Sequence, residues 1–536
     1  MRDIVLFAVS ILQVFCACSV VKTGADIQRL AHSGSQKVII DSDIDLEGIS
    51  LSLPKGCKLA FRGGSISNGH LSFDSVIIKG HPKFKNCTYK GTIRIDSIDD
   101  CDYPSSDDAG TLKFLLSNAI ANGARCKFYR DYRIDMNKVT GGGLVSLSNI
   151  ESGADISFQE HSIYNTKPFP KATTKPLIVL CNVKGVTIRE CKFHDVDEHN
   201  THKFKKSAGC TFMHCYGDCE GINLLNCSQE NGDCILRSGV YTHNTNRPER
   251  TPMVGLSNAV LKVSSRNTGY GLAIYCGDNL NIDLVVDSPH RGFYCTGVSN
   301  SKINYRGYNP LETKCHILIK DAVYRRNTTS EGAVLDMKGC HNLVINAEID
   351  EIMAGESVVI FQSYGSGKKE GADFTFRSGK CHHYNIDITA NINRCPANES
   401  YSICTFNSDS GALNEDDMYG CKVSGVVIHN VNCTMGVTNP YMCNFGPFID
   451  ADIDVRDCHL TSLGANSKQS FNYRVLGNTS GRIRVKNSLV GNVIVRKKTS
   501  GIFELEVEEK SQIPEPKYSN DNSVRGLVRV LKKPIN

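Results

Sequence analysis

The chain has 536 residues, of which 22% are charged, a formal net charge of +5 and no tryptophan. The small excess of Lys and Arg is compatible with an acidic polymer as partner and equally with a solvated surface, and no basic patch with interleaved aromatic residues suggests nucleic-acid binding. Val, Ile, Asn, Gly and Ser recur throughout while helical periodicity is scarce, which favours a strand-rich repeat over a set of helical domains.

Residues 1–18 have the order of an export signal, with Arg2 followed by an apolar run that is too short to span a bilayer. Ala17 before Cys18 resembles a bacterial lipoprotein cleavage site, although Phe15 stands where such sites usually have Leu. We therefore expect export to the periplasm or the outer surface of the cell. A lipid on Cys18 and a mature protein without a lipid remain alternatives.

Three further sections follow the signal. Residues 19–105 contain short alternating runs separated by Gly, Asn and Pro, as expected of an N-terminal β-rich section. Residues 106–505 continue this theme over many similar segments and form the main repeat. Residues 506–536 are charged and rich in turn residues, and we expect a loose C-terminal tail.

One helix interrupts the strands at the start of the main section. Leu112, Leu115, Leu116 and Ile120 recur with helical spacing, and Gly123 follows as a helix terminator. An amphipathic helix at the N-terminal side of a stack of strands can close its otherwise open end, so we expect a capping helix here.

The strand segments repeat with a period near 21 residues. Asn258, Asn279 and Asn300 each open an alternating segment at this spacing. An all-strand repeat of this length indicates a parallel β-helix, in which Asn side chains at the corners can hydrogen-bond along the stack. A β-sandwich would need regular hairpin signals and a propeller would need a period near 40, and neither is seen.

These features resemble a known family. The helix-then-strand opening, the 21-residue coils and "LPKGCKLAFRGGSISNG" at 53–69 are similar to exported, right-handed parallel β-helix proteins of the pectate-lyase-like superfamily, in particular polysaccharide lyases of Bacteroidota. The resemblance covers about residues 35–500. It implies an all-β fold and a uronic-acid polymer, such as a glycosaminoglycan, as substrate.

The coil "DSPHRGFYCTGVSN", 287–300, carries polar side chains that the preceding coil lacks. His290, Arg291 and Tyr294 stand where that coil has Gly269, Tyr270 and Ala273. Strict alternation along a strand places Phe293 and Cys295 inside and Gly292, Tyr294 and Thr296 on the outer face. The same alternation places Arg291 inside, at a corner of the coil.

Such residues suit β-elimination of a uronic-acid polymer. We expect His290 to be base or acid and Tyr294 or Tyr270 to be its partner in proton transfer. Arg291, together with Arg237 or Lys320, would bind the substrate carboxylate, since a guanidinium fork matches both carboxylate oxygens.

Two basic segments are candidates for the walls of a groove. Lys203 and Lys205 lie in "THKFKKS", and Arg247 and Arg250 lie in "NTNRPERTP". Their charge suits a polyanion, and the alternative is that both are ordinary solvated loops.

"ENGDCILRSG", 230–239, resembles a conserved segment of polygalacturonase-type glycoside hydrolases, with Arg237 where that family has Lys. Inverting hydrolysis needs two carboxyl groups, and here only Asp233 stands at the expected place, while Tyr270 replaces the family's His. Asp233 is therefore predicted to assist substrate binding, with the cap of a turn as the alternative. A glycoside hydrolase and a non-catalytic glycan-binding solenoid remain alternatives to the lyase.

No cofactor motif is present, and the 24 cysteines show no zinc spacing. We interpret most of them as small buried hydrophobic residues of successive coils. Carboxylates around Asp195 are a candidate Ca²⁺ site, with a solvated loop as the alternative. The expected partner is an acidic polysaccharide, bound by a monomer.

Overall fold

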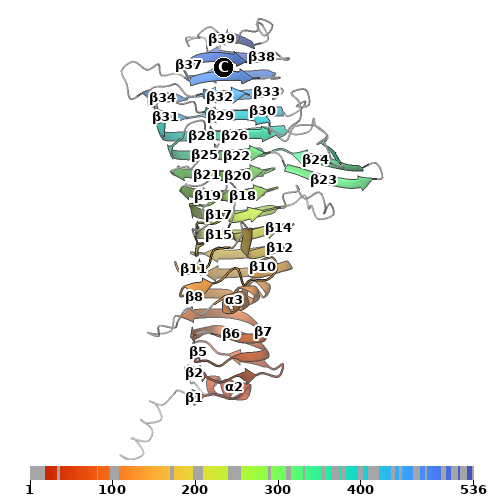
Figure 1. Cartoon of the computed structure of the whole chain (residues 1–536), viewed down its shortest axis with the longest axis vertical. Helices are drawn as coiled ribbons and strands as arrows, with labels where there is room; N and C mark the ends of the chain where they lie inside the picture. The colour runs from red at the N-terminus through yellow and green to blue at the C-terminus, as the bar shows by residue number, and fades with distance from the viewer. Residues whose placement is uncertain are drawn as a thin grey trace, which may run out of the picture. The chain divides into compact units, whose positions relative to one another are not determined.

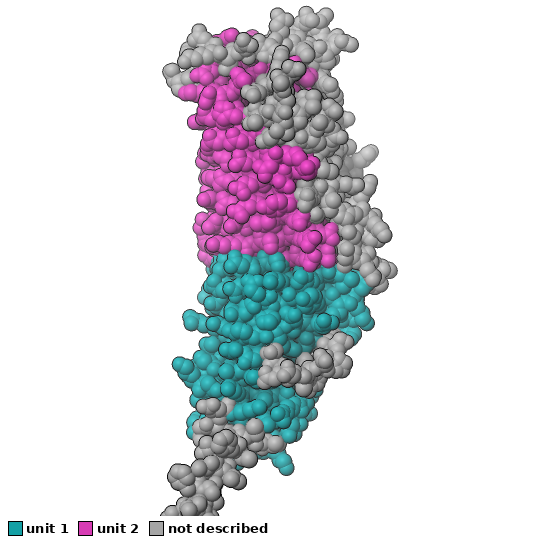
Figure 2. All heavy atoms as spheres, turned by 90° about the vertical axis from the view of Figure 1, so that its left-hand side faces the viewer, with its two compact units in different colours: residues 1–171, 175–198, 221–228 teal, residues 172–174, 199–220, 229–536 magenta. Residues whose placement is uncertain are grey.

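The computed structural model describes the chain in segments. They are residues 19–32, 37–80, 82–96, 108–169, 174–196, 209–239, 255–287, 291–308, 315–320, 322–329, 332–352, 357–363, 374–376, 382–395, 402–408, 422–435, 441–445, 450–462, 471–476, 480–496, 502–508, 517–518 and 528–533. Two compact units make up the chain: unit 1 contains residues 1–171, 175–198 and 221–228, and unit 2 contains residues 172–174, 199–220 and 229–536 (Figure 2).

Nearly all described elements are strands (Figure 1). Up to Glu230 they are β1 (Ser19–Val20), α2 (Gly24–His32), β2 (Lys37–Ile40), β3 (Ile44–Asp45), β4 (Ser50–Leu53), β5 (Lys58–Phe61), β6 (Ile66–Gly80), β7 (Phe84–Asp96), α3 (Ala109–Ala121), β8 (Arg125–Tyr129), β9 (Tyr132–Ile134), β10 (Val145–Ser157), β11 (Ser162–Asn165), β12 (Thr174–Arg189), β13 (Lys192–His194), β14 (Gly209–Tyr216) and β15 (Cys219–Glu230).

The remaining elements are β16 (Cys234–Ser238), β17 (Leu256–Arg266), β18 (Tyr270–Tyr275), β19 (Asp278–Asp287), β20 (Arg291–Thr296), β21 (Ser299–Tyr308), β22 (Cys315–Lys320), β23 (Ala322–Thr329), β24 (Gly332–Lys338), β25 (His341–Glu351), β26 (Ser357–Ser363), β27 (Phe374–Phe376), β28 (His382–Cys395), β29 (Ser402–Ser408), β30 (Lys422–His429), β31 (Asn432–Met435), β32 (Tyr441–Phe445), β33 (Ala451–Arg456), β34 (His459–Ser462), β35 (Phe471–Leu476), β36 (Gly481–Lys486), β37 (Val490–Arg496), β38 (Phe503–Glu508), β39 (Lys517–Tyr518) and β40 (Val528–Lys533).

Within each unit the strands pair in parallel with the strand one coil further along the chain. In unit 1, β6 pairs with β7, β7 with β8, and β8 with β10. In unit 2 one row of strands runs β14, β16, β18, β20, β22, β26 and β29, and a second runs β17, β19, β21, β25, β28 and β30. The predicted right-handed parallel β-helix is confirmed. A separate small sheet contains β23, β24 and β27.

The predicted asparagine stack is present at a corner of unit 2. Asn279 donates to Asn258 (2.6 Å), Asn342 to Asn300 (2.7 Å) and Asn385 to Asn342 (2.8 Å). All five have φ between 50° and 53°. Asn tolerates this left-handed conformation better than other residues with a side chain, so the same residue both turns the chain and bonds to the next coil.

The two helices among the described residues, α2 and α3, belong to unit 1. α3 begins at Ala109, and Leu112, Leu115, Leu116 and Ile120 are fully buried, as predicted. It does not close the stack, however, because β7 and β8 on either side of it pair directly with each other. The helix at the N-terminal end is α2.

α2 was not predicted, although its N-terminus carries a local signal. The Asp26 N–H donates to Thr23 Oγ1 (3.2 Å), and the Thr23 N–H donates back to Asp26 Oδ2 (3.1 Å). This reciprocal arrangement satisfies two main-chain donors at the start of the helix. Ile27 and Ala31 are the buried residues of this short helix. Among the described residues no helix has the length and apolar character needed to cross a membrane.

The segment 506–536 is not simply a tail. It includes β39, which pairs with β37, and β40, which pairs with β38 over six residues from Val528 to Lys533. The prediction of a loose tail is wrong for these strands, because the alternating "VRVLKK" can extend the parallel ladder despite its charge.

The cysteines agree with their interpretation as small buried hydrophobic residues. Those whose side chains the structure describes are free thiols, and all but Cys181 and Cys276 are buried.

The strands β18 and β20 depart from strict alternation at a glycine. A Cβ at Gly292 would clash with Tyr305 Oη and the main-chain oxygen of His316, both of which belong to the interior. Leu272 and Phe293, one residue after Gly271 and Gly292, are also interior and no more than 1% exposed. Two successive residues therefore face inward, and the strand bends at this point. The predicted outward position of Gly292 is wrong.

The bend makes Gly292 sensitive to substitution. We expect Gly292→Ala to lower the free energy of unfolding by about 1–3 kcal/mol, because the added methyl group overpacks a filled interior. Urea unfolding monitored by circular dichroism measures this. The matched control is Gly110→Ala in α3, where a Cβ meets nothing within 4 Å. It should be neutral or stabilising by less than about 1 kcal/mol. Equal effects of the two substitutions would contradict the bend.

Candidate functional site

The predicted site residues that the structure describes lie on neighbouring strands of unit 2. Register places His214 of β14 beside Arg237 of β16, Arg237 beside Ala273 of β18, and Ala273 beside Tyr294 of β20. In the same way Tyr270 lies beside Arg291. Paired strands are about 4.8 Å apart, so residues far apart in sequence form continuous rows across the coils.

A buried ion pair lies at the centre of these rows. Arg237 Nη2 donates to Asp233 Oδ2 at 2.7 Å and to Oδ1 at 3.0 Å, and Thr211 Oγ1 donates to Oδ2 at 2.9 Å. Asp233 has no exposed surface, whereas the side chain of Arg237 is 21% exposed. Burial is the largest single influence and lowers the pKa of Arg237, but the Asp233 carboxylate together with Cys234, Tyr275 and Tyr270 raises the pKa above its usual value. Arg237 therefore keeps its positive charge, and the buried Asp233 carboxylate fixes its position.

Asp233 cannot act as a direct substrate ligand in this arrangement. Both carboxylate oxygens accept hydrogen bonds from protein groups, and neither reaches the surface. The predicted substrate-binding role of Asp233 is thus replaced by an indirect one: it fixes the position of the Arg237 guanidinium.

Tyr270 lies between two arginines. The Arg237 Cζ is 5.4 Å from the centroid of its ring, and the Arg291 Cζ is 5.8 Å from the same centroid. Tyr270 is partly exposed, and its hydroxyl has no hydrogen-bond partner within the described part of the chain. Cations near an aromatic ring are attracted by its electron-rich face, so the three side chains form one cluster, which we call the Arg–Tyr–Arg cluster.

Arg291 shares the outer face with Tyr270, and the predicted inward position is wrong. The bend at Gly292 reverses the alternation that was assumed for the preceding residue. Arg291 is partly exposed and forms no ion pair with any described residue. Its positive charge is therefore available to a ligand, and burying it inside would have been unfavourable.

Tyr294 lies on the predicted face but is only 5% exposed. Its ring centroid is 5.3 Å from that of Tyr275 and 6.0 Å from that of Tyr270, and it belongs to a buried apolar cluster with Ala273 and Leu318. The structure thus makes Tyr294 a support for Tyr270. Its predicted role in proton transfer would require an exposed hydroxyl, and Tyr270 is the better placed of the two.

Lys320 of β22 is adjacent to Thr296 of β20, two positions along from the row that contains Tyr294. It is 3% exposed. A buried lysine cannot reach a polymer on the surface, so the structure does not support its predicted contact with the substrate. Of the three residues predicted to bind the substrate carboxylate, Arg291 and Arg237 remain partly exposed.

Several predicted residues lie outside the described residues. They are His290, Lys203, Lys205, Arg247, Arg250 and the lipid-site candidate Cys18. Their roles stay predictions.

One residue of the site was missed. His214 occupies the position next to Arg237, and its ring centroid is 3.9 Å from that of Tyr216. Burial and then the charge of Arg237 lower the pKa of His214 to about 4, so its ring is neutral at neutral pH. The signal was present: aligning "TFMHC" at 211–215 with "CILRS" at 234–238 places His214 on Arg237.

The described residues give little support for the candidate Ca²⁺ site. Asp195 is buried, and its Oδ1 accepts hydrogen bonds from Asn165 Nδ2 (2.7 Å) and from the Val196 N–H (2.8 Å). Asp197 and Glu198 lie outside the described residues. Within the described ranges, no group of three or more His, Cys, Asp or Glu side chains could hold a metal ion.

Of the comparisons with known proteins, only the one with solved structures found matches. No family model and no curated protein matches the sequence. The structure is similar to a surface adhesin of Streptococcus pneumoniae, PfbA (11% identity, 87% of this chain, 90% of that chain, TM-score 0.31), and to a family 28 exopolygalacturonase of Yersinia enterocolitica (12%, 96%, 76%, 0.27). A third is the catalytic domain of a GH87 α-1,3-glucanase in complex with nigerose (10%, 84%, 59%, 0.23).

At these TM-scores the likeness carries no argument about reaction or substrate. The resemblance to exported lyases therefore stays a prediction, and the assignment of function rests on the geometry of the site.

The buried Asp233–Arg237 pair should contribute more to stability than an exposed pair. We expect Asp233→Asn to lower the free energy of unfolding by about 3 kcal/mol, because it leaves the mostly buried Arg237 without a compensating charge. Urea unfolding measures the change.

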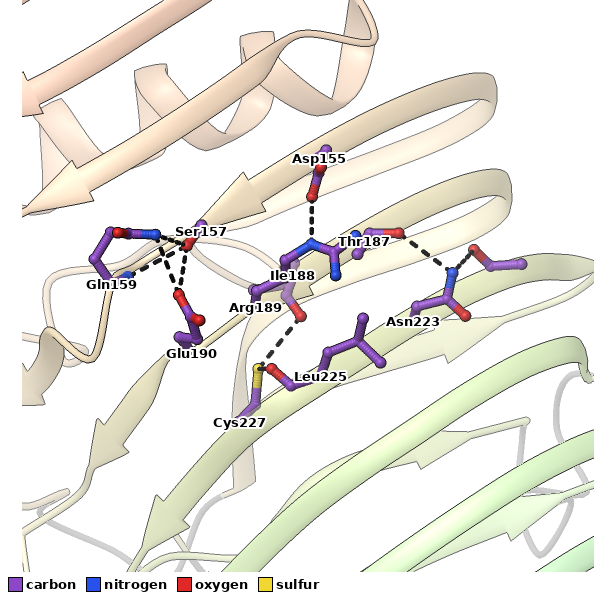
Figure 3. Close-up of polar contacts among 11 residues, drawn as sticks. Asp155, Ser157, Gln159, Thr187, Ile188, Arg189, Glu190, Asn223, Leu225 and Cys227 are labelled. Atoms are coloured by element: carbon purple, nitrogen blue, oxygen red, sulfur yellow. Dashed lines mark hydrogen bonds and ion pairs between the residues drawn. The ribbon is translucent and has the colours of Figure 1, made fainter.

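The matched control is Asp155→Asn in unit 1. Asp155 Oδ1 accepts from Arg189 Nε at 2.8 Å, beside the polar contacts of Ser157 and Glu190 (Figure 3). This pair is 44% and 42% exposed, so its loss should lower the free energy of unfolding by less than about 1 kcal/mol. A small effect of Asp233→Asn would show that Arg237 is not fixed by this contact.

Proposed function

We propose that this chain is a polysaccharide lyase that cleaves an acidic, uronic-acid-containing polysaccharide by β-elimination. The observation that carries the proposal is the Arg–Tyr–Arg cluster of Arg237, Tyr270 and Arg291. It combines a partly exposed guanidinium without an ion pair among the described residues, a partly exposed phenol, and a second guanidinium whose charge is neutralised from inside.

The charges of the cluster suit a substrate carboxylate. Two arginines and one aspartate leave one net positive charge. That charge lies at Arg291, since the Asp233 carboxylate neutralises Arg237. A guanidinium fork can donate to both oxygens of a carboxylate. Binding there would also stabilise the additional negative charge that the carboxylate gains when the neighbouring carbon loses its proton.

A base removes the proton from C5 of the uronate, the C5–H electrons form a C4–C5 double bond, and the bond from C4 to the glycosidic oxygen breaks. An acid gives a proton to that leaving oxygen. The Tyr270 hydroxyl is suited to one of these transfers, and His290 remains the predicted residue for the other.

The burial of Asp233 argues against the hydrolase alternative. Inverting hydrolysis needs one carboxylic acid at the leaving group and a carboxylate that activates water. Asp233 has no exposed oxygen, and the described residues provide no second carboxylate in the Arg–Tyr–Arg cluster. A binding solenoid without catalysis would use the same arginines, so the reaction itself must separate it from a lyase.

The location and partners belong to the same proposal. We propose export to the periplasm or cell surface through residues 1–18, either with a lipid on Cys18 or without it. The protein would act as a monomer on a glycosaminoglycan or a pectin-like polymer.

The first test is ultraviolet absorbance during incubation with chondroitin, dermatan, hyaluronan, heparin, alginate and pectin. We expect a rise on at least one polymer, because the C4–C5 double bond is conjugated with the carboxylate. Arg291→Gln should lower kcat/KM about a hundredfold, as expected for loss of a group that stabilises the developing charge. The matched control is Arg306→Gln, whose side chain is 49% exposed and pairs with Glu348 at 3.1 Å on β21 and β25. It should leave kcat/KM unchanged.

Other outcomes distinguish the alternatives. New reducing ends without ultraviolet absorbance would replace the lyase by a hydrolase. Polymer binding that weakens in Arg291→Gln, with no new chain ends in the wild type, would indicate a binding solenoid. Tyr270→Phe separates the two roles further, because a lyase should lose turnover while it retains binding.

A further inference from the structure

His214 and Arg237 hold a pair of buried polar atoms that the proposed reaction does not use. Nε2 of His214 and Nε of Arg237 are buried, and neither has a hydrogen-bond partner within the described residues. The two residues are register neighbours on β14 and β16. The side chains themselves remain partly exposed, so the two atoms lie just beneath the surface beside the Arg–Tyr–Arg cluster.

The protonation of His214 follows from its neighbours. A hydrogen bond to the main chain of Gly239 raises the pKa of His214, which is the effect of a ring N–H that donates to a carbonyl. Since Nε2 has no described partner, Nδ1 is the donor. Burial and Arg237 hold the pKa at about 4, so the ring is neutral and Nε2 carries a lone pair. His214 therefore presents an acceptor.

Arg237 presents the opposite polarity. Its Nη2 is bound to Asp233, whereas the Nε–H is a donor. The Asp233 contact fixes the guanidinium, and the contact with Tyr216 restrains the His214 ring. A fixed acceptor next to a fixed donor defines the chemistry of what can bind between them. Buried polar atoms without a partner are unfavourable, so a ligand that satisfies both gains affinity.

A hydroxyl group meets both requirements, because it donates one hydrogen bond and accepts others. A carboxylate or a sulfate ester offers only acceptors and would meet the lone pair of His214 with its own negative charge. We propose that His214 and Arg237 form a binding site for a free hydroxyl group of the polysaccharide, next to the carboxylate site at Arg291. This specificity site rests on the proposed function for the identity of its ligand.

The consequence is discrimination against modified sugars. A polymer with a free hydroxyl at this position should bind better than the same polymer with that hydroxyl acetylated, because acetylation removes the donor and adds bulk. Arg291 by itself does not discriminate in this way, since the carboxylate is present in both polymers.

The test compares each polymer of the panel that binds the wild type with its O-acetylated derivative. Dissociation constants are measured by isothermal titration calorimetry, and KM and kcat by ultraviolet absorbance. His214→Phe keeps an aromatic ring against Tyr216 but removes the acceptor. We expect it to weaken binding of the native polymer about tenfold, to raise KM more than it lowers kcat, and to leave binding of the acetylated polymer unchanged. His214→Gln, which retains an acceptor oxygen, should restore part of the preference.

The control is His194→Phe in unit 1, where the ring of His194 likewise contacts a tyrosine, Tyr164, at 4.8 Å between centroids. It should change neither polymer's affinity. A lower unfolding temperature of His214→Phe with an intact preference would give His214 a purely structural role and overturn the proposal, as would equal affinities of the wild type for the native and acetylated polymers.

The two proposals fail separately. Binding with a preference for free hydroxyl groups but without a C4–C5 double bond would overturn the lyase and leave the hydroxyl site. Elimination without that preference would do the reverse. Absence of binding to every polymer would overturn both.

Discussion

The left-handed asparagine at the coil corner is the constraint on which unit 2 depends. Asn258, Asn279, Asn300, Asn342 and Asn385 turn the chain at the same point of successive coils. Hydrogen bonds join Asn258 to Asn279 and Asn300 to Asn342 and Asn385, while Asn300 donates to Asp278 in the coil of Asn279. Because the corner repeats, each strand pairs with the equivalent strand of the next coil, residue against residue. A side chain is therefore placed by its distance from the corner, and residues 21 or more positions apart become neighbours.

This geometry explains how a site arises without any local sequence motif. Arg237, Tyr270 and Arg291 come from three successive strands of one row, and no two of them are closer than 21 residues in sequence. The interior supplies the support: Asp233 fixes Arg237, and the buried ring of Tyr294 packs against Tyr270. The buried carboxylate of Asp233 thus determines the net charge that the Arg–Tyr–Arg cluster presents at the surface.

The fold could be predicted from sequence because its signals are periodic. Alternation gives strands, the 21-residue spacing gives the coil, and Asn gives the corner. The site could be predicted only in part, since a glycine bend at Gly292 reversed the face assigned to Arg291. The burial of charged side chains could not be predicted either. Lys320 and Asp233 are of residue types that usually lie at the surface, yet both are buried. His214 was missed because it carries no motif, and only its register with Arg237 makes it notable.

Two arginines of the same cluster differ in chemistry because of their neighbours. Arg291 has no anion beside it among the described residues, so its full charge and both edges of its guanidinium favour an anionic ligand. Arg237 is neutralised by Asp233 through Nη2, which leaves its Nε–H beside a neutral imidazole. A charged group gains little there, whereas a hydroxyl satisfies both atoms. A uronic acid carries a carboxylate and hydroxyl groups on one ring, and these two unlike positions, about two or three coil spacings apart, suit such a sugar more closely than either position alone.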